Sequence, residues 1–567
     1  RLPLATSGRR PRLARDEGKA MTGYWQRLST RRISRRQALR AGAAGLGAGA
    51  LALAGCGGSE SKQTSTPVAE GTPQPGGTLV YGLNSDPGDL DEQEGVTNYW
   101  CSSQFNGFLF HINLKTQEMM LQMADKFEQP DELTYLWTLK PDIKFHNVDP
   151  VNGRVVTADD VVYSMTRRRD DPVSQNDKQF LRDFTAGFEA VDPLTFKLTT
   201  KQPYRPAIDE LGNPSYPIVP HEAVEKFGDL KSNPVGCGPY ILTEFIRAQS
   251  VKMHKNPDYF MPGRPYLDNI EWQIILEAST CLQAFETGKH DYTTVSLDKL
   301  KVERLQSLSH VVIREVPNFW RHTLLLRVDQ DPFKDPRTWE AIDLTVDRSD
   351  LIEKMAFGEG QYTGPVPASL TQYTLPQDEL REFYKVDLTK AKQLLSAAGF
   401  SDGLDFDGYL ENVVDMQKFA TVLKDQLSKV NINMNIIPRE LGTYLAQNLY
   451  GRNFQGTMYY NLPYVEPDRP LCAYYSKGQA GFSFSGYSNP AIDVWIEKER
   501  AEFDNDKRRQ IILDAQRDML KEHGPQINTY IPTAWAAHKD WVHGVEKVVG
   551  IGAASYLNIE NWVTPKP

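Results

Sequence analysis

The segment Asn-Pro-Val-Gly-Cys-Gly-Pro-Tyr at residues 233–240 constrains the backbone more than any other stretch of the chain. Its two prolines fix φ and remove amide donors, while its two glycines permit positive φ or the close approach of another backbone. A run rich in β-forming residues follows it directly. From composition alone we therefore expect a tight loop that leads into a strand.

Residues 1–55 have the composition of an export leader rather than of a folded domain. A basic stretch precedes an apolar, glycine- and alanine-rich run that is too short for a stable membrane span. Arg35 and Arg36 resemble the pair of a twin-arginine signal, although Arg31 and Arg32 form a competing pair. Leu-Ala-Gly-Cys at 53–56 resembles a lipobox, so we expect cleavage before Cys56 and lipid attachment to its thiol.

Composition after the leader narrows the possible partners. Residues 56–76 are rich in Ser, Thr, Gly, Pro and Gln and predict a flexible tether between the lipid and a folded part. A net charge of −9, with many of the basic residues in the leader, argues against nucleic-acid binding. We expect a protein anchored to the outer face of the cell membrane or held in the periplasm.

The other four cysteines, Cys101, Cys237, Cys281 and Cys472, lack C-x-x-C spacing, which argues against a zinc ribbon or a thioredoxin-type site. We expect mostly buried free thiols. Neither G-x-S-x-G, nor H-E-x-x-H, nor a P-loop is present, so no enzyme activity, cofactor or metal is predicted.

Strands alternate with helices along the chain, which indicates an α/β architecture. Strands are predicted at 77–83, 135–146, 196–199 and 433–438. Helices are predicted at 98–110, after an N-cap at Thr157, and at 387–399, 419–429, 490–502 and 507–521.

Seven segments carry motifs in a recognisable order. They include GGTLVYGLNSDPGDLDEQ (76–93), VVTADDVVYSMTRRRDDP (155–172), NPVGCGPYILTEF (233–245), RVDQDPFKDPRTWEAIDLTVDRSDLIEKMAFGEG (327–360), YKVDLTKAKQLLSAAGF (384–400) and YSNPAIDVWIEKERAEFDNDKRRQII (487–512). Together they resemble the family 5 extracellular solute-binding proteins, the oligopeptide, dipeptide and nickel group that serves ABC importers. The resemblance covers residues 76–562.

The resemblance implies a two-lobed, periplasmic-binding-protein-like α/β fold with a hinge. Lobe I would comprise 77–104, 233–319 and 530–567, with an inserted sub-domain at 105–232, and lobe II would comprise 320–529. Residues 233–240 would then mark the return from the sub-domain into lobe I. A solute bound between the lobes would favour the closed state.

The implied function is that of a monomeric, lipid-anchored subunit that delivers a peptide or peptide-like solute to ABC permease and ATPase subunits. Three alternatives stay open. The solute is a sugar, an opine or a metal chelate; the protein reports its ligand to a membrane sensor; or the scaffold serves an exported lipoprotein enzyme.

Aromatic side chains supply the candidate ligand contacts, with an ordinary aromatic core as the alternative explanation. The candidates lie in three segments, and Trp320 and Tyr460 are favoured because family pockets draw on their segments: Tyr99, Trp100, Phe319, Trp320, His322, Tyr459, Tyr460 and Tyr464.

One position departs from the pattern of peptide-binding relatives. Many of them carry an aspartate, which pairs with the peptide amine, shortly before the residue that matches Pro467. Pro463 occupies that place here and cannot pair with an ammonium. Either a neighbour such as Glu466 or Asp468 substitutes, or the ligand lacks that amine.

Overall fold

The computed structural model describes residues 72–94, 99–113, 116, 118–170, 179–316, 318, 320–460, 466–477, 483–545 and 559–566. The predicted leader, the lipid site Cys56 and most of the predicted tether lie outside these ranges. The described residues all fall within one unit of the chain, Glu70–Pro567. None of the helices in the described ranges has the length and apolar character needed to cross a bilayer.

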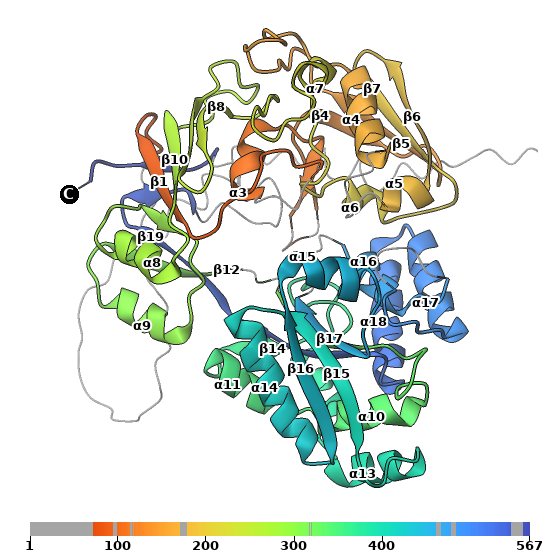
Figure 1. The fold of residues 1–567 in the computed structure, drawn as a ribbon. Helices are drawn as coiled ribbons and strands as arrows, with labels where there is room; N and C mark the ends of the chain where they lie inside the picture. The colour runs from red at the N-terminus through yellow and green to blue at the C-terminus, as the bar shows by residue number, and fades with distance from the viewer. Residues whose placement is uncertain are drawn as a thin grey trace, which may run out of the picture. The chain divides into compact units, whose positions relative to one another are not determined.

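A seven-stranded sheet joins segments that are far apart in the sequence, as the red, green and blue strands of Figure 1 show. Strand β1 is central and runs parallel to β10 and β11. In spatial order the strands are β12 (Val311–Val316), β19 (Ala534–Lys539), β11 (Tyr292–Thr293), β1 (Thr78–Leu83), β10 (Asn269–Ile274), β9 (Ser250–Lys255) and β8 (Tyr240–Ile246). The helices α8 (Ala278–Glu286) and α9 (Lys299–Gln306) precede β11 and β12.

A six-stranded sheet forms the framework of the second half of the chain. Strand β15 runs parallel to its neighbours β16 and β17, and β17 adjoins β13, which is antiparallel to both β17 and β18. The spatial order is β14 (Gly360–Tyr362), β18 (Gln526–Pro532), β13 (His322–Leu326), β17 (Gly456–Tyr460), β15 (Leu404–Glu411) and β16 (Ile432–Arg439).

Helices pack on this sheet and share one apolar core with it. They are α10 (Pro336–Thr345), α11 (Arg348–Ala356), α13 (Leu388–Ala397), α14 (Val414–Ser428), α17 (Pro490–Ala501) and α18 (Asn505–Lys521). Shorter helices are α12 (Gln377–Phe383), α15 (Leu441–Thr443) with the π-helical turn η2 (Tyr444–Leu449), and α16 (Asp468–Leu471) with the 3₁₀ turn η3 (Cys472–Tyr474).

A four-stranded antiparallel sheet forms a separate core around the fully buried Trp137. Its order is β4 (Ala124–Glu128), β5 (Thr134–Leu139), β7 (Thr195–Thr200) and β6 (Thr185–Asp192). The helices nearby are α4 (Ala158–Asp170), α5 (Gln179–Asp183), α6 (Ala207–Glu210) and α7 (His221–Phe227). Two small sheets pair β2 (Phe110–Ile112) with β3 (Met119–Leu121) and β20 (Val542–His543) with β21 (Trp562–Val563).

These three larger sheets confirm the predicted α/β class. The predicted boundaries of the lobes and the sub-domain stay a prediction. Most predicted strands and helices are present, including α4, which begins directly after Thr157; the Asp160 carboxylate accepts the Thr157 amide hydrogen bond at 2.8 Å.

Two predicted elements are wrong in extent. The helix predicted over 98–110 is only the short α3 (Tyr99–Ser102) with the 3₁₀ turn η1 (Ser103–Phe105), because the backbone becomes extended at Asn106. The strand predicted to continue through residue 146 ends at Leu139, since a turn with positive φ at Asp142 follows Pro141.

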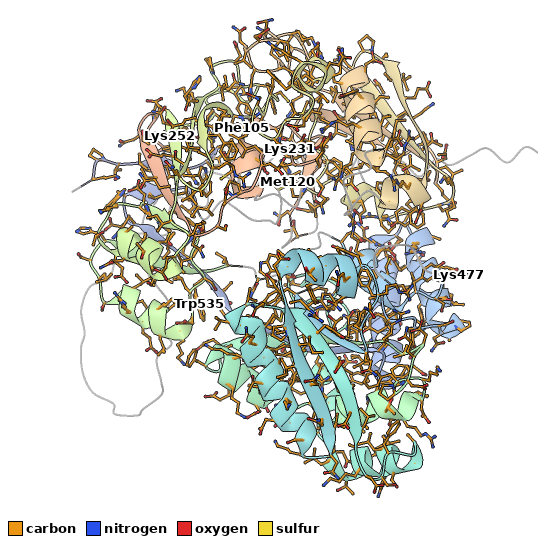
Figure 2. All side chains as sticks on the ribbon, viewed as in Figure 1. Phe105, Met120, Lys231, Lys252, Lys477 and Trp535 are labelled. Atoms are coloured by element: carbon orange, nitrogen blue, oxygen red, sulfur yellow. The ribbon has the colours of Figure 1, made fainter. Side chains whose placement is uncertain are left out.

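The glycines of residues 233–240 are explained by close backbone contact rather than by positive φ. A Cβ on Gly238 would lie 2.5 Å from the Gln104 carbonyl oxygen, and one on Gly236 would overlap the Phe105 carbonyl. Phe105, labelled in Figure 2, is fully buried and accepts a 3.0 Å hydrogen bond from the Gly238 amide. Cys237 is fully buried between them, as predicted for a free structural thiol.

Candidate ligand-binding site

Four strands of the six-stranded sheet begin or end at the same side of the sheet, which we call its ligand-facing candidate edge. Strands β15 and β17 are parallel neighbours, so their carboxyl ends, at Glu411 and Tyr460, lie at the same edge. The antiparallel strand β13 begins at this edge with His322, which pairs with Tyr460 on one side and with Tyr530 of β18 on the other. The carboxyl ends of parallel strands are the places where α/β proteins bind ligands.

Helix α14 begins directly after β15, so its first turn places Asp415 at the same edge. Six side chains meet there and form what we call the Asp415 cluster: Trp320, His322, Asp415, Phe419, Tyr460 and Tyr530.

The His322 ring is the centre of the Asp415 cluster. It is 3 % exposed and stacks on Tyr530 with ring centroids 4.9 Å apart. The Phe419 ring is tilted against the His322 ring, and the Tyr460 ring meets it edge to face. The ring centroids lie 5.0 Å apart in both pairs. Trp320 meets Tyr460 edge to face at 6.0 Å and is 50 % exposed, so the outer side of the cluster is aromatic and open to solvent.

The Asp415 carboxylate is oriented by two neighbours. His322 Nε2 lies 2.7 Å from Asp415 Oδ2, and the Tyr460 hydroxyl donates to the same oxygen at 2.8 Å. Partial burial raises the pKa of Asp415, but the hydrogen bonds from His322 and Tyr460 outweigh it and hold that pKa below its usual value. Burial and the Asp415 charge raise the pKa of Tyr460. The carboxylate is therefore ionised and the phenol neutral at pH 7.

The structure brings three of the eight predicted ligand residues together: Trp320, His322 and Tyr460. Tyr459, the neighbour of Tyr460 in β17, instead hydrogen-bonds Gln526 at 3.2 Å and packs with a separate apolar group. The backbones of Tyr99 and Trp100 lie in α3, whereas Phe319 and Tyr464 lie outside the described residues.

Asp415, Phe419 and Tyr530 did not emerge as candidates from the sequence. Asp415 resembles an ordinary acid in the first turn of a helix. Its position after a buried strand of a parallel pair was the available signal, but the predicted start of the helix at residue 419 hid it. Tyr530 reaches the cluster only through a pairing across 208 residues of chain, between His322 and Tyr530.

The two acids considered as replacements for the missing aspartate are both engaged elsewhere. Glu466 and Asp468 are each 1 % exposed. Glu466 accepts the amide hydrogen bonds of Asp468 and Arg469, at 2.7 and 2.8 Å. Asp468 accepts from the Tyr204 hydroxyl at 2.7 Å and from Arg500 at 2.6 Å. Neither presents a free carboxylate to a solute, and Pro463 lies outside the described residues.

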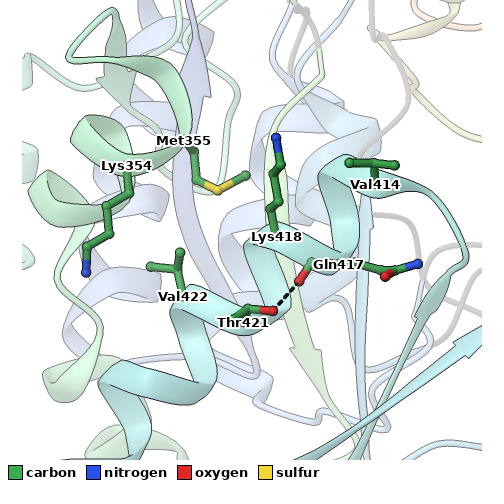
Figure 3. A pocket seen from close by; sticks show the side chains of 7 residues that line it. All are labelled: Lys354, Met355, Val414, Gln417, Lys418, Thr421 and Val422. Atoms are coloured by element: carbon green, nitrogen blue, oxygen red, sulfur yellow. Dashed lines mark hydrogen bonds between the residues drawn. The ribbon is translucent and has the colours of Figure 1, made fainter.

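A separate surface cavity of about 410 Å³ lies between α11 and α14 and is drawn in Figure 3. Alkyl groups of Met355, Val414 and Val422 line it together with the polar side chains of Lys354, Lys418, Gln417 and Thr421. The Thr421 hydroxyl donates to the Gln417 carbonyl at 2.7 Å, which satisfies it within the helix. Val414 and Lys418 of the cavity are sequence neighbours of Asp415 and Phe419, but none of the six residues of the Asp415 cluster lines the cavity.

Within the described ranges, no three His, Cys, Asp or Glu side chains are arranged to hold a metal ion.

Comparison with known proteins shows which family the chain is similar to. The family model of bacterial extracellular solute-binding proteins, family 5 Middle, matches residues 118–482. The glutathione-binding protein GsiB of Escherichia coli O1:K1 is 27 % identical over 464 residues, which cover 79 % of this chain and 87 % of GsiB.

Two solved structures share the fold. The periplasmic binding protein DppA of Helicobacter pylori, in complex with the peptide STSA, has a TM-score of 0.75 at 22 % identity and covers 87 % of this chain and 99 % of its own. The binding protein AgaA of A. tumefaciens R10, in complex with agropinic acid, has a TM-score of 0.73 at 22 % identity, with the same coverage of 87 % and 99 %. Since the family model spans well over half of the sequence, the chain belongs to family 5 of the bacterial extracellular solute-binding proteins.

Proposed function

We propose that the protein is the solute-binding subunit of an ABC importer and captures a peptide or peptide-like solute at the Asp415 cluster. The solute would lie between two lobes, and lobe closure around it would present the loaded protein to the permease. One observation above all supports this: Tyr460 links an ionised carboxylate, Asp415, to a half-exposed tryptophan, Trp320, where the carboxyl ends of two parallel strands meet.

The similarity to known proteins supports the class of solute. GsiB is named for glutathione, and the DppA and AgaA structures hold a peptide and agropinic acid. Glutathione and STSA are peptides, whereas agropinic acid is an opine, one of the alternative solutes that stay open. Proteins of this kind bind by shape, aromatic contact and a few polar groups, so no catalytic group is needed.

The test begins with native mass spectrometry of the protein purified from its host without added solute. Glutathione, the peptide STSA and agropinic acid are then titrated separately by calorimetry. We expect a retained solute of peptide-like mass or saturable binding of glutathione or STSA, with the solute recovered unchanged after denaturation. Recovery of a converted product would instead support an exported enzyme. Binding of agropinic acid alone, or a retained sugar or metal chelate, would place the solute in another class.

We also propose that the protein is exported and anchored by lipid on Cys56 of the lipobox. Replacing that thiol removes the atom to which a diacylglyceryl group would be attached, so Cys56→Ala should move the protein from the membrane fraction to the soluble extracytoplasmic fraction. Metabolic labelling with a radioactive fatty acid gives a second readout. Cys101→Ala, at a buried free cysteine, is the control and should keep the label. Labelling of the Cys56→Ala protein would contradict the proposal.

A further inference from the structure

The two oxygens of Asp415 have different environments. The two side chains that hydrogen-bond Asp415, His322 and Tyr460, both contact its Oδ2 atom. Oδ1 receives no hydrogen bond from any residue in the described ranges, and the Asp415 side chain is 53 % exposed. A carboxylate accepts about four hydrogen bonds, so this group is held in place by one oxygen and can offer the other to a ligand.

The exposed aromatic surface next to Tyr460, which donates to the Asp415 carboxylate, favours a cation. Trp320 exposes half of its surface beside Tyr460, and the face of an indole ring attracts ammonium and guanidinium groups. His322 Nδ1 is buried without a partner among the described residues, so the cluster retains a further polar atom that its own side chains do not satisfy.

The charges nearby are mixed. Glu411 ends β15 at the same side of the sheet, but Arg439, the last residue of β16, lies beside it in the strand pairing. Lys418 lies one turn further along α14. The preference for a cation therefore rests on the free oxygen of Asp415 and on the indole face rather than on net charge.

We propose that Asp415 is a specificity-determining residue that binds the protonated primary amine of the solute through Oδ1, while Trp320 covers the same ammonium. The substrate class is then a peptide-like solute with a free amino terminus. This inference rests on the proposed function, and it assigns the amine to a residue of α14 rather than to the segment before Pro467. The buried carboxylates of Glu466 and Asp468 leave that role to Asp415.

The test compares wild type with Asp415→Asn, which keeps the shape and hydrogen-bond acceptor of the side chain but removes its charge. The probes are an equimolar random tripeptide library without Lys, Arg or His, and the same library after N-acetylation. Bound peptides are measured by native mass spectrometry. Asp425→Asn, at an exposed position of the same helix, is the matched control.

We expect wild type and Asp425→Asn to bind the free-amine library at least about tenfold more tightly than the acetylated one, as the loss of a charge-assisted hydrogen bond implies. Asp415→Asn should lose that difference. Equal binding of both libraries by wild type, or a preference that survives in Asp415→Asn, would overturn the inference and leave the proposed function intact. Binding of neither library by wild type would also overturn the inference, whereas the proposed function would fall only if binding of glutathione and STSA and a retained peptide-like solute were absent as well.

Discussion

Trp320 is the most exposed aromatic member of the Asp415 cluster, and this exposure is why we assign it a contact with the solute. An indole that is 50 % exposed contributes less to the core than a buried one, while its free face is available to a solute. We predict that Trp320→Ala weakens solute binding by about 1–3 kcal/mol, as measured by calorimetry, and changes the free energy of unfolding by much less.

Trp495 is a suitable control for this substitution. It is partly buried against the core, and its indole nitrogen donates to Asp518 at 2.9 Å on α18. Trp495→Ala should lower stability and leave affinity unchanged. Equal losses of affinity in the two variants would mean that Trp320 acts through the fold.

Three members of the cluster, Trp320, His322 and Tyr460, could be predicted from the sequence, but its charged residue and the aromatic residues Phe419 and Tyr530 could not. Trp320 and Tyr460 stand in aromatic segments that attract attention on their own. Asp415 stands between ordinary residues, and only strand pairing and the start of α14 bring it to His322. Residues whose role depends on long-range contacts leave little local signal.

At the element scale, the glycine-rich segment 233–240 is a contact between two backbones. We predict that Gly238→Ala lowers the free energy of unfolding by about 3 kcal/mol, because the new methyl group would meet the backbone of Gln104, Phe105 and Asn106, which cannot move independently. Chemical denaturation measures this directly.

Gly187→Ala provides the matched control. Gly187 lies in β6, and a Cβ there meets nothing within 4 Å. Alanine should be neutral or slightly stabilising at this position, since it reduces the entropy of the unfolded chain. A loss at Gly187 equal to that at Gly238 would contradict the explanation by close approach.

Elements with strong local signals were predictable. Helix α13 has Asp387 as its N-cap and Gly399, with φ of 92°, shortly after its end; both were visible in the sequence. The helix predicted after residue 98 failed because nothing local shows that Gly107 must pack against Cys237 and Met123. Tertiary contact, rather than propensity, sets that boundary.

At the scale of the whole molecule, a buried ionic cluster joins the core of the four-stranded sheet to that of the six-stranded sheet. We call it the arginine–carboxylate cluster. Its four arginines and five carboxylates, each at most 7 % exposed, are Arg205, Arg469, Arg500, Arg508, Asp209, Glu210, Glu466, Asp468 and Glu499.

Contacts across the two cores hold this cluster together. Arg469 forms a two-pronged ion pair with Glu210 of α6, and Arg508 of α18 reaches Asp209 at 3.3 Å. With one more carboxylate than arginine, the cluster is expected to retain a proton. Burial and neighbouring carboxylates raise the pKa of Glu466 well above its usual value. Burial and the Asp468 charge raise the pKa of Glu499 to about 8, although Arg508 opposes both shifts.

This proton gives stability a defined dependence on pH. The folded protein keeps the Glu499 proton up to about pH 8, whereas the unfolded chain releases it near the usual pKa of 4.5. The contribution is therefore complete below about pH 4.5 and is lost as pH rises to about 8, with a slope of up to about 1.4 kcal/mol per pH unit.

Chemical denaturation at pH 5, 6.5 and 8 measures the slope. We predict that Glu499→Gln reduces this slope by about 1.4 kcal/mol per pH unit, which corresponds to one proton. Glu522→Gln, at an exposed position at the end of α18, should leave the slope unchanged. An unchanged slope in Glu499→Gln would place the retained proton on another carboxyl group.

A crystal structure of the protein with the solute that it retains from its host would show whether that solute binds at the Asp415 cluster. We predict solute density with an amine within hydrogen-bond distance of Asp415 Oδ1 and in contact with the Trp320 ring. Solute density confined to another place, such as the cavity between α11 and α14, would contradict the account.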